Sequence, residues 1–162
     1  MNYHNITKND MLNGSGLRVV LWVSGCEHRC VGCHNPETWD INSGIPFDIN
    51  AENELFEALN HDYISGITFS GGDPLHIQNR SEIRRLINRF KKEFPNKNIW
   101  LYTGYLFEDI KDLDFIEDID VLCDGRFSLY LKDENTHWVG STNQRVIDIK
   151  ETLDKNRIVL YN

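Results

Sequence analysis

The chain has 162 residues, enough for one domain with its own hydrophobic core but few for a complete eight-stranded barrel. Its formal charge of -8, from 17 Lys and Arg against 25 Asp and Glu, argues against a nucleic-acid-binding surface, because phosphate binding needs concentrated positive charge. The N-terminus has no basic segment followed by an apolar one, and no apolar run is long enough to cross a bilayer. We expect a single domain over residues 1–162 in a cytoplasmic protein with no nucleic-acid or membrane partner.

The first predicted strand, residues 17–24, leads directly into a cysteine-rich turn that we call the cysteine loop, residues 25–34. It carries Cys26, Cys30 and Cys33, with three and two residues between successive cysteines. Thiolates at this spacing can converge on one metal centre, and three of them leave one coordination position for another ligand. An iron–sulfur cluster with one open iron is the leading hypothesis.

Two other interpretations of the cysteines stay open at this point. A structural zinc site would complete the three thiolates with His28 or His34 as the fourth ligand. The remaining cysteine, Cys123, lies in a strand-like segment, and we interpret it as a core residue and not as a fourth ligand. A disulfide framework is disfavoured, because three of only four cysteines are clustered.

Residues 34–39 are predicted to begin a short helix, with Asn35 as its N-cap and Pro36 in its first turn. N–H groups at the start of that helix would point toward the cysteines. Such donors suit the negative charge of a thiolate-bound cluster.

A predicted helix over residues 51–59, with Asn50 as its N-cap, precedes the second predicted strand, residues 66–70. Gly71-Gly72-Asp73-Pro74 follows this strand. Paired glycines let the backbone approach a ligand closely, although the same tetrapeptide is also an ordinary turn. The carboxyl ends of parallel strands form the ligand site, so this turn is expected to face the cysteine loop across one rim.

The next helix is predicted over residues 81–94, with Ile83, Leu86, Ile87 and Phe90 as its buried stripe. We interpret its basic residues as a solvated face; the alternative is a docking patch for an acidic electron donor such as a flavodoxin. These basic residues are Arg80, Arg84, Arg85, Arg89, Lys91 and Lys92.

Two more strands, residues 98–103 and 119–124, end in glycine-bearing turns, and residues 146–149 and 158–160 look like further strands without a clear place. Strands that alternate with helices predict βαβ units, hence an α/β fold with a parallel sheet. The turns after all four main strands are expected to share one site.

Three cysteines at this spacing after the first strand of an α/β chain resemble the radical S-adenosylmethionine superfamily. The resemblance implies a [4Fe-4S] cluster on Cys26, Cys30 and Cys33, whose open iron binds the methionine part of S-adenosyl-L-methionine. Reductive cleavage of that molecule would give a 5′-deoxyadenosyl radical. Many members carry an aromatic residue where this chain has Gly32, but the branch that activates glycyl-radical enzymes tolerates glycine there.

The superfamily resemblance also implies a cofactor-binding set and a fold. The turn after the second strand would recognise the amino group of S-adenosylmethionine, and the backbone near the third cysteine would contact its adenine end. The implied fold is an incomplete, open parallel (β/α) barrel with no indispensable acid–base side chain. The implied cofactor-binding residues are Gly32, Cys33, His34, Gly71, Gly72 and Asp73.

Further segments occur in one order over nearly the whole chain and are similar to the activating proteins of anaerobic, class III ribonucleoside-triphosphate reductases. They include Asn13–Gly14, Trp39, Thr103–Tyr105, Asp124–Gly125 and Gly140–Gln144. The resemblance implies an oxidoreductase that generates a glycyl radical on the C-terminal loop of the large reductase subunit. The alternatives are an activator of another glycyl-radical enzyme such as pyruvate formate-lyase, a small-molecule cyclase, or a non-enzymatic zinc- or iron–sulfur-binding module.

Overall fold

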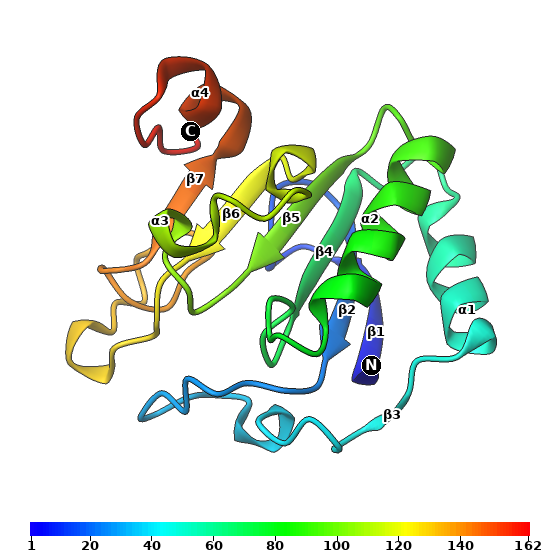
Figure 1. Ribbon diagram of the computed structural model, residues 1–162, viewed down its shortest axis with the longest axis horizontal. Helices are drawn as coiled ribbons and strands as arrows, with labels where there is room; N and C mark the ends of the chain where they lie inside the picture. The colour runs from blue at the N-terminus through cyan, green and yellow to red at the C-terminus, as the bar shows by residue number, and fades with distance from the viewer.

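The computed structural model describes residues 1–162 and has a mixed α/β fold around one open sheet of seven strands (Figure 1). The strands lie in the order β3-β1-β2-β4-β5-β6-β7. Their bounds are β1 Asn2–Asp10, β2 Arg18–Val23, β3 Ile45–Pro46, β4 Gly66–Gly71, β5 Asn98–Tyr102, β6 Val121–Asp124 and β7 Arg145–Asp148.

The four central strands, β2, β4, β5 and β6, are parallel, which confirms the predicted α/β fold and its four main strands. The expectation of a wholly parallel sheet was wrong at both edges. β1 pairs antiparallel with β2 and with β3, and β7 pairs antiparallel with β6. β1 was not predicted, because its polar sequence buries only Tyr3 and Ile6 and lacks an apolar run.

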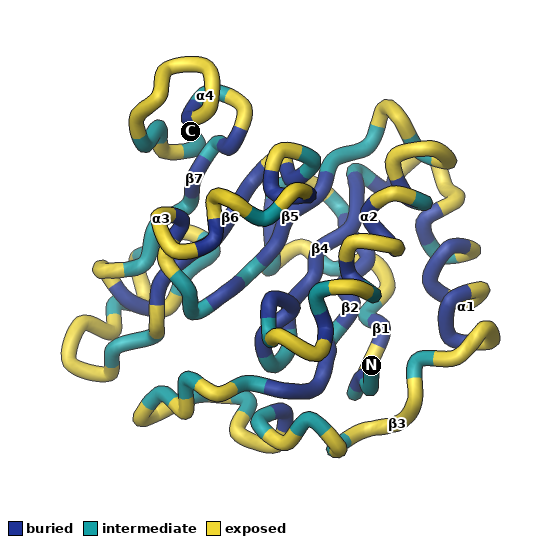
Figure 2. The backbone as a smooth tube through the Cα atoms, viewed as in Figure 1, coloured by how far each residue is buried: buried dark blue, intermediate teal, exposed yellow.

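Residues of the central strands alternate between two covered faces, so the strands read as continuous apolar runs. One face, with residues such as Leu21 and Phe69, belongs to the main hydrophobic core, which also contains the buried stripe of α2. The opposite face, with Trp100 and Cys123, packs against residues of the C-terminal part of the chain. Figure 2 shows the central strands as the most deeply buried part of the backbone.

Helices and single turns connect the strands. None of the helices is long and apolar enough to span a membrane. The α-helices are α1 Ile49–Leu59, α2 Arg80–Glu93, α3 Phe107–Ile110 and α4 Ile149–Lys155, and the 3-10 turns are η1 Pro36–Thr38, η2 Ile116–Asp118 and η3 Leu129–Leu131.

Three local predictions need correction. α1 begins two residues earlier than predicted, because Asp48 and not Asn50 is its N-cap and accepts a hydrogen bond from the Ala51 N–H. The helix predicted after the cysteine loop is only the single 3-10 turn η1, and Asn35 precedes it without a side-chain cap. The predicted strand at residues 158–160 was wrong, since only Leu160 makes an isolated bridge there.

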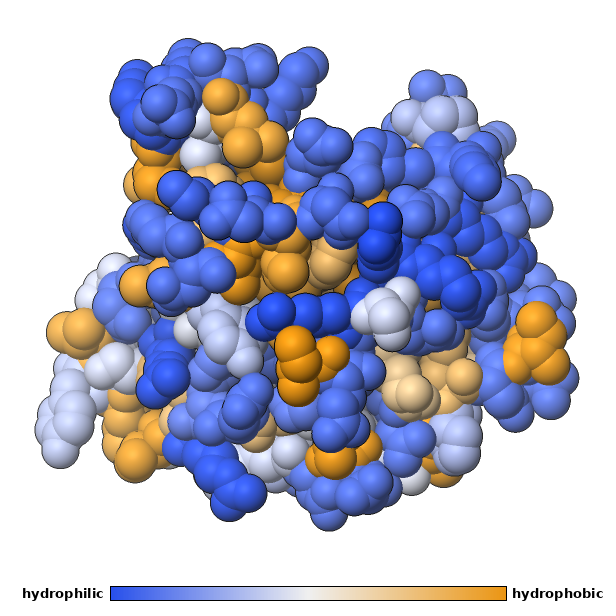
Figure 3. Space-filling view, viewed as in Figure 1, coloured by the Kyte–Doolittle hydropathy of each residue, from blue (hydrophilic) through white to orange (hydrophobic).

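Four of the six basic residues of α2, namely Arg84, Arg85, Arg89 and Lys91, form ion pairs with acidic neighbours, as expected of a solvated helix face. Arg85 and Arg89 both reach Glu52 of α1, and Figure 3 shows a largely hydrophilic surface over these helices. This face therefore carries less free positive charge than its sequence alone suggests. The remaining pairs are Arg84–Asp114, Arg85–Glu82, Arg89–Glu93 and Lys91–Asp118.

Candidate functional site

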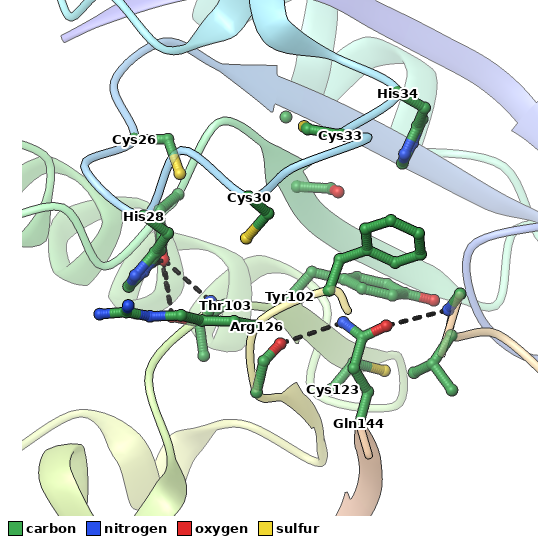
Figure 4. Close-up of a pocket in the computed structure, with 18 of the residues that line it drawn as sticks. Cys26, His28, Cys30, Cys33, His34, Tyr102, Thr103, Cys123, Arg126 and Gln144 are labelled. Atoms are coloured by element: carbon green, nitrogen blue, oxygen red, sulfur yellow. Dashed lines mark hydrogen bonds and ion pairs between the residues drawn. The ribbon is translucent and has the colours of Figure 1, made fainter. Parts of the chain in front are cut away.

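The loops beyond the carboxyl ends of the central strands surround one cavity of about 680 Å³. Cys26, Cys30 and Cys33 line it together with Gly71–Asp73, so the predicted meeting of these two loops at one rim is confirmed. Figure 4 shows the three cysteines along one side of the cavity. The other labelled residues around it are His28, His34, Tyr102, Thr103, Cys123, Arg126 and Gln144.

The base of the cysteine loop is fixed by backbone hydrogen bonds to the segment that follows it. The N–H of Gly25 donates to the Thr38 carbonyl at 2.8 Å, and that of Cys26 donates to the Trp39 carbonyl at 3.0 Å. The Asn35 N–H lies 3.4 Å from Sγ of Cys33 and donates to it. The loop therefore reaches the cavity from a defined starting point, and all three of its cysteines are partly exposed.

At Cys26 and Cys30, burial raises the thiol pKa more than nearby hydrogen-bond donors lower it. Burial raises the pKa of Cys26 to about 11 and also raises the pKa of Cys30. Backbone N–H groups near each sulfur oppose this rise, those of His28 and Arg29 at Cys26 and that of Phe127 at Cys30. These donors would stabilise the thiolates once a metal centre displaces the protons.

The donor set fits an iron–sulfur cluster better than a single zinc ion. No group of three or more His, Cys, Asp or Glu side chains lies close enough to hold one metal ion. A [4Fe-4S] cluster instead takes each thiolate on a separate iron, so its cysteines stand farther apart around a cavity. Trp39 adds a buried indole N–H without a partner in the cavity wall, a donor available to an anionic group.

The turn after β4 lies directly against the cysteine loop, and its glycines are needed for that approach. Gly71 has φ +111°, and a β-carbon on Gly72 would lie 2.6 Å from the Gly25 carbonyl oxygen. The Asp73 N–H donates to the same oxygen at 2.7 Å. A side chain at Gly72 would therefore separate the two loops, and one at Gly71 would meet the backbone of Val23 at the end of β2.

Asp73 itself is 1% exposed, and donors from three loops surround its carboxylate. Its Oδ2 pairs with Nε2 of His28 at 2.7 Å and accepts the Gly104 N–H at 3.0 Å. The Thr103 hydroxyl lies 2.9 Å from Oδ1, which also accepts the Leu75 N–H at 2.8 Å. In this structure the carboxylate thus faces protein donors, and its expected contact with a cofactor stays a prediction.

The other residues predicted to contact a cofactor also line the cavity. Gly32 has φ +77°, and a β-carbon there would lie 3.0 Å from Leu129, so the tip of the cysteine loop leans on the turn η3. His34 is exposed at the cavity edge. The structure brings Gly32, Cys33 and His34 together with the turn after β4, and their roles stay predictions.

The sequence placed the turn Gly125–Arg126 at the shared site but missed the contribution of residues 127–144, where no periodic pattern guided it. Arg126, which makes no ion pair, borders the cavity, and its charge partly opposes the rise that burial causes in the pKa of Cys30. Gln144 fastens the segment: its amide donates to the Gly125 carbonyl at 3.0 Å and accepts the Gly140 N–H at 3.0 Å. In the sequence, only the Gly140–Gln144 motif, with its glycine and its Gln144 amide, indicated that this segment has a role.

Cys123 comes from β6 and not from the cysteine loop. It is 1% exposed, and burial raises the pKa of its thiol to about 12. It packs with Trp100 and Val121, which confirms its interpretation as a core residue, although it also borders the cavity.

Comparison with known proteins agrees with this site. The sequence model of a family described as "4Fe-4S single cluster domain" matches residues 12–147. The chain is 48% identical over 146 residues to the anaerobic ribonucleoside-triphosphate reductase-activating protein of Enterobacteria phage T4, covering 90% of this chain and 93% of the phage protein.

Bacterial proteins of the same name are similar to the chain over nearly their whole length. The protein of Escherichia coli strain K12 is 45% identical over 150 residues, 90% of this chain and 97% of its own. That of Vibrio cholerae is 41% identical, over 89% and 96% of the two chains. The chain therefore belongs to the family of anaerobic ribonucleoside-triphosphate reductase-activating proteins, and it matches the model of a 4Fe-4S single cluster domain over most of its length.

Proposed function

We propose that this chain activates an anaerobic ribonucleoside-triphosphate reductase by generating a glycyl radical on the large reductase subunit, as a radical S-adenosylmethionine oxidoreductase. The observation that carries the proposal is the single cavity lined both by Cys26, Cys30 and Cys33 and by the glycine turn after β4. Family membership supports the reductase as the partner, because each relative is named for activating it.

In this proposal Cys26, Cys30 and Cys33 hold the [4Fe-4S] cluster, and S-adenosyl-L-methionine binds beside it. When bound, the reduced cluster supplies the electron that cleaves S-adenosylmethionine to methionine and a 5′-deoxyadenosyl radical. The chain's own residues bind S-adenosylmethionine and orient it beside the cluster. The turn of Gly71, Gly72 and Asp73 recognises the amino group at the methionine end, and the backbone of Gly32–His34 meets the adenine end.

The open sheet is consistent with a large substrate that reaches the cavity from outside. The parallel core of β2, β4, β5 and β6 supports the proposal of an incomplete, open radical S-adenosylmethionine barrel, although the antiparallel edge strands are additions to it. An open sheet leaves the cavity accessible to a macromolecular substrate. The reacting segment of the partner would be a loop that carries the glycine.

An acidic flavodoxin-type protein is proposed as the electron donor. Charge complementarity would then mainly speed the encounter. The ion pairs along α2 leave only Arg80 and Lys92 among its basic residues without an acidic partner, so reversing charge on that helix should have a small effect on donor-dependent reduction. A large, donor-specific effect would place the docking surface there.

The test mixes the anaerobically reconstituted chain with reductant, S-adenosylmethionine and the purified reductase. We expect methionine and 5′-deoxyadenosine to be released and a glycyl radical to appear in the electron paramagnetic resonance spectrum of the reductase. A radical on pyruvate formate-lyase but none on the reductase would favour the alternative activator. Absence of cleavage with an intact cluster would favour a non-enzymatic iron–sulfur module.

A further inference from the structure

His28 is the one inward-facing side chain between two cluster cysteines. It stands midway between Cys26 and Cys30, and its neighbours Glu27 and Arg29 are exposed. The His28 side chain, by contrast, is only 4% exposed. A buried imidazole in an otherwise exposed loop needs a hydrogen-bond partner, because burying a polar group without one costs free energy.

The partner is the Asp73 carboxylate, and the slot around the ring is closely fitted. Nε2 of His28 lies 2.7 Å from Oδ2 of Asp73. On one side the ring meets Gly104, where a β-carbon would lie 2.7 Å from Nε2. On the other it packs edge-to-face against Tyr105, with ring centroids 4.6 Å apart. The Tyr105 hydroxyl in turn donates to Glu27 of the same loop at 3.0 Å.

Asp73 is fixed independently of His28. The N–H groups of Leu75 and Gly104 and the Thr103 hydroxyl all bind its carboxylate, and Asn79 donates to its backbone carbonyl at 3.1 Å. The loops after β2, β4 and β5 therefore meet at one buried carboxylate. His28 is the only side chain of the cysteine loop that reaches it.

We propose that His28 is a positioning residue: through Asp73 it fixes the cysteine loop so that Cys26 and Cys30 enter the cavity in cluster-binding geometry before the cluster is assembled. Each sulfur lies only two residues from the fixed imidazole, which limits how far the loop can move. Preorganised ligands lose less conformational freedom on metal binding, and partners behind the ligands commonly contribute 10–100-fold in affinity. This inference depends on the cluster but not on S-adenosylmethionine or the reductase.

The test measures how firmly the reconstituted full-length chain retains its cluster. His28→Phe keeps an aromatic ring of similar size but removes the hydrogen bond, and Asp73→Asn removes the carboxylate charge. We expect each to raise the rate constant for iron release to a chelator by about tenfold or more. The double variant should release iron no faster than the faster single variant, because both remove the same interaction. His61→Phe and Asp62→Asn, two exposed neighbours far from the cavity, are the matched controls.

His28→Gln provides the rescue, since its side-chain amide can donate from nearly the position of Nε2. It should restore slow iron release and the wild-type paramagnetic spectrum of the reduced cluster. A merely structural role would instead lower the melting temperature of the cluster-free chain without changing release from folded protein.

Wild-type release rates in both His28→Phe and Asp73→Asn would overturn the proposal. So would a His28→Gln variant as fast as His28→Phe, because ring packing and not the hydrogen bond would then matter. If His28→Phe does not fold, the comparison of His28→Gln with Asp73→Asn tests the proposal. Slow iron release from His28→Gln together with fast release from Asp73→Asn supports it, and equal release rates contradict it.

Discussion

Gly104 and His28 are packed so closely that a β-carbon on Gly104 would overlap the imidazole ring. The turn after β5 thus has glycine because the cysteine loop lies against it, and not because of a positive φ. Gly104→Ala should displace His28, destabilise the chain by about 1–3 kcal/mol and speed iron release. In a His28→Ala background the same substitution should cost little, since the ring is gone. A full cost in both backgrounds would refute this explanation.

The three loop cysteines should be separable from the fourth. Replacing Cys26, Cys30 or Cys33 by Ala should abolish the cluster, measured as iron and sulfide bound per chain after reconstitution. Cys123→Ala is the matched control: it removes a buried sulfur at a cost on the order of 1 kcal/mol but should leave the cluster intact. Cluster loss in Cys123→Ala, with the chain still folded, would make Cys123 a ligand.

Because of Glu52, the free energy of unfolding should fall as the pH is lowered into the acid range. Hydrogen bonds from Arg85 and Arg89 hold the pKa of its carboxyl below the usual range. The charged form is therefore favoured by folding, so its contribution is complete above the unfolded-state pKa and is lost as pH falls through the folded-state value.

Glu52→Gln should accordingly lower the free energy of unfolding by about 1–2 kcal/mol at pH 7 and by much less near pH 3. Chemical denaturation at several pH values measures this difference. Glu93→Gln, which removes an exposed partner of Arg89, should change stability by less than about 0.5 kcal/mol. A difference between Glu52→Gln and wild type that stays constant with pH would contradict the argument.

Arg145 attaches the edge strand β7 to the sheet by pairing with the fully buried carboxylate of Asp124. Arg145→Leu would leave that carboxylate with only the Phe107 N–H as a donor. We expect a loss of about 3–5 kcal/mol in unfolding free energy. Arg84→Leu breaks an exposed pair with Asp114 and should cost less than about 1 kcal/mol. Similar costs for the two variants would show that Asp124 has other means of compensation.

The central strands and the cysteine loop could be predicted because their sequences carry local signals: apolar runs that end in glycine turns, and a distinctive cysteine spacing. β1 could not, since its polar residues form a strand only through pairing with β2. The link between His28 and Asp73 was also missed, because the two lie 45 positions apart in the sequence and neither belongs to a periodic pattern. Long-range polar contacts of this kind depend on the assembled fold.

The most direct test of the account is electron paramagnetic resonance of the anaerobically reconstituted, dithionite-reduced chain before and after addition of S-adenosylmethionine. We predict the signal of a reduced four-iron cluster and a clear change in that signal on addition, because one iron is open to the added molecule. A cluster signal that S-adenosylmethionine leaves unchanged would contradict the proposed cofactor site. Zinc in place of iron, with no paramagnetic signal, would contradict the cluster itself.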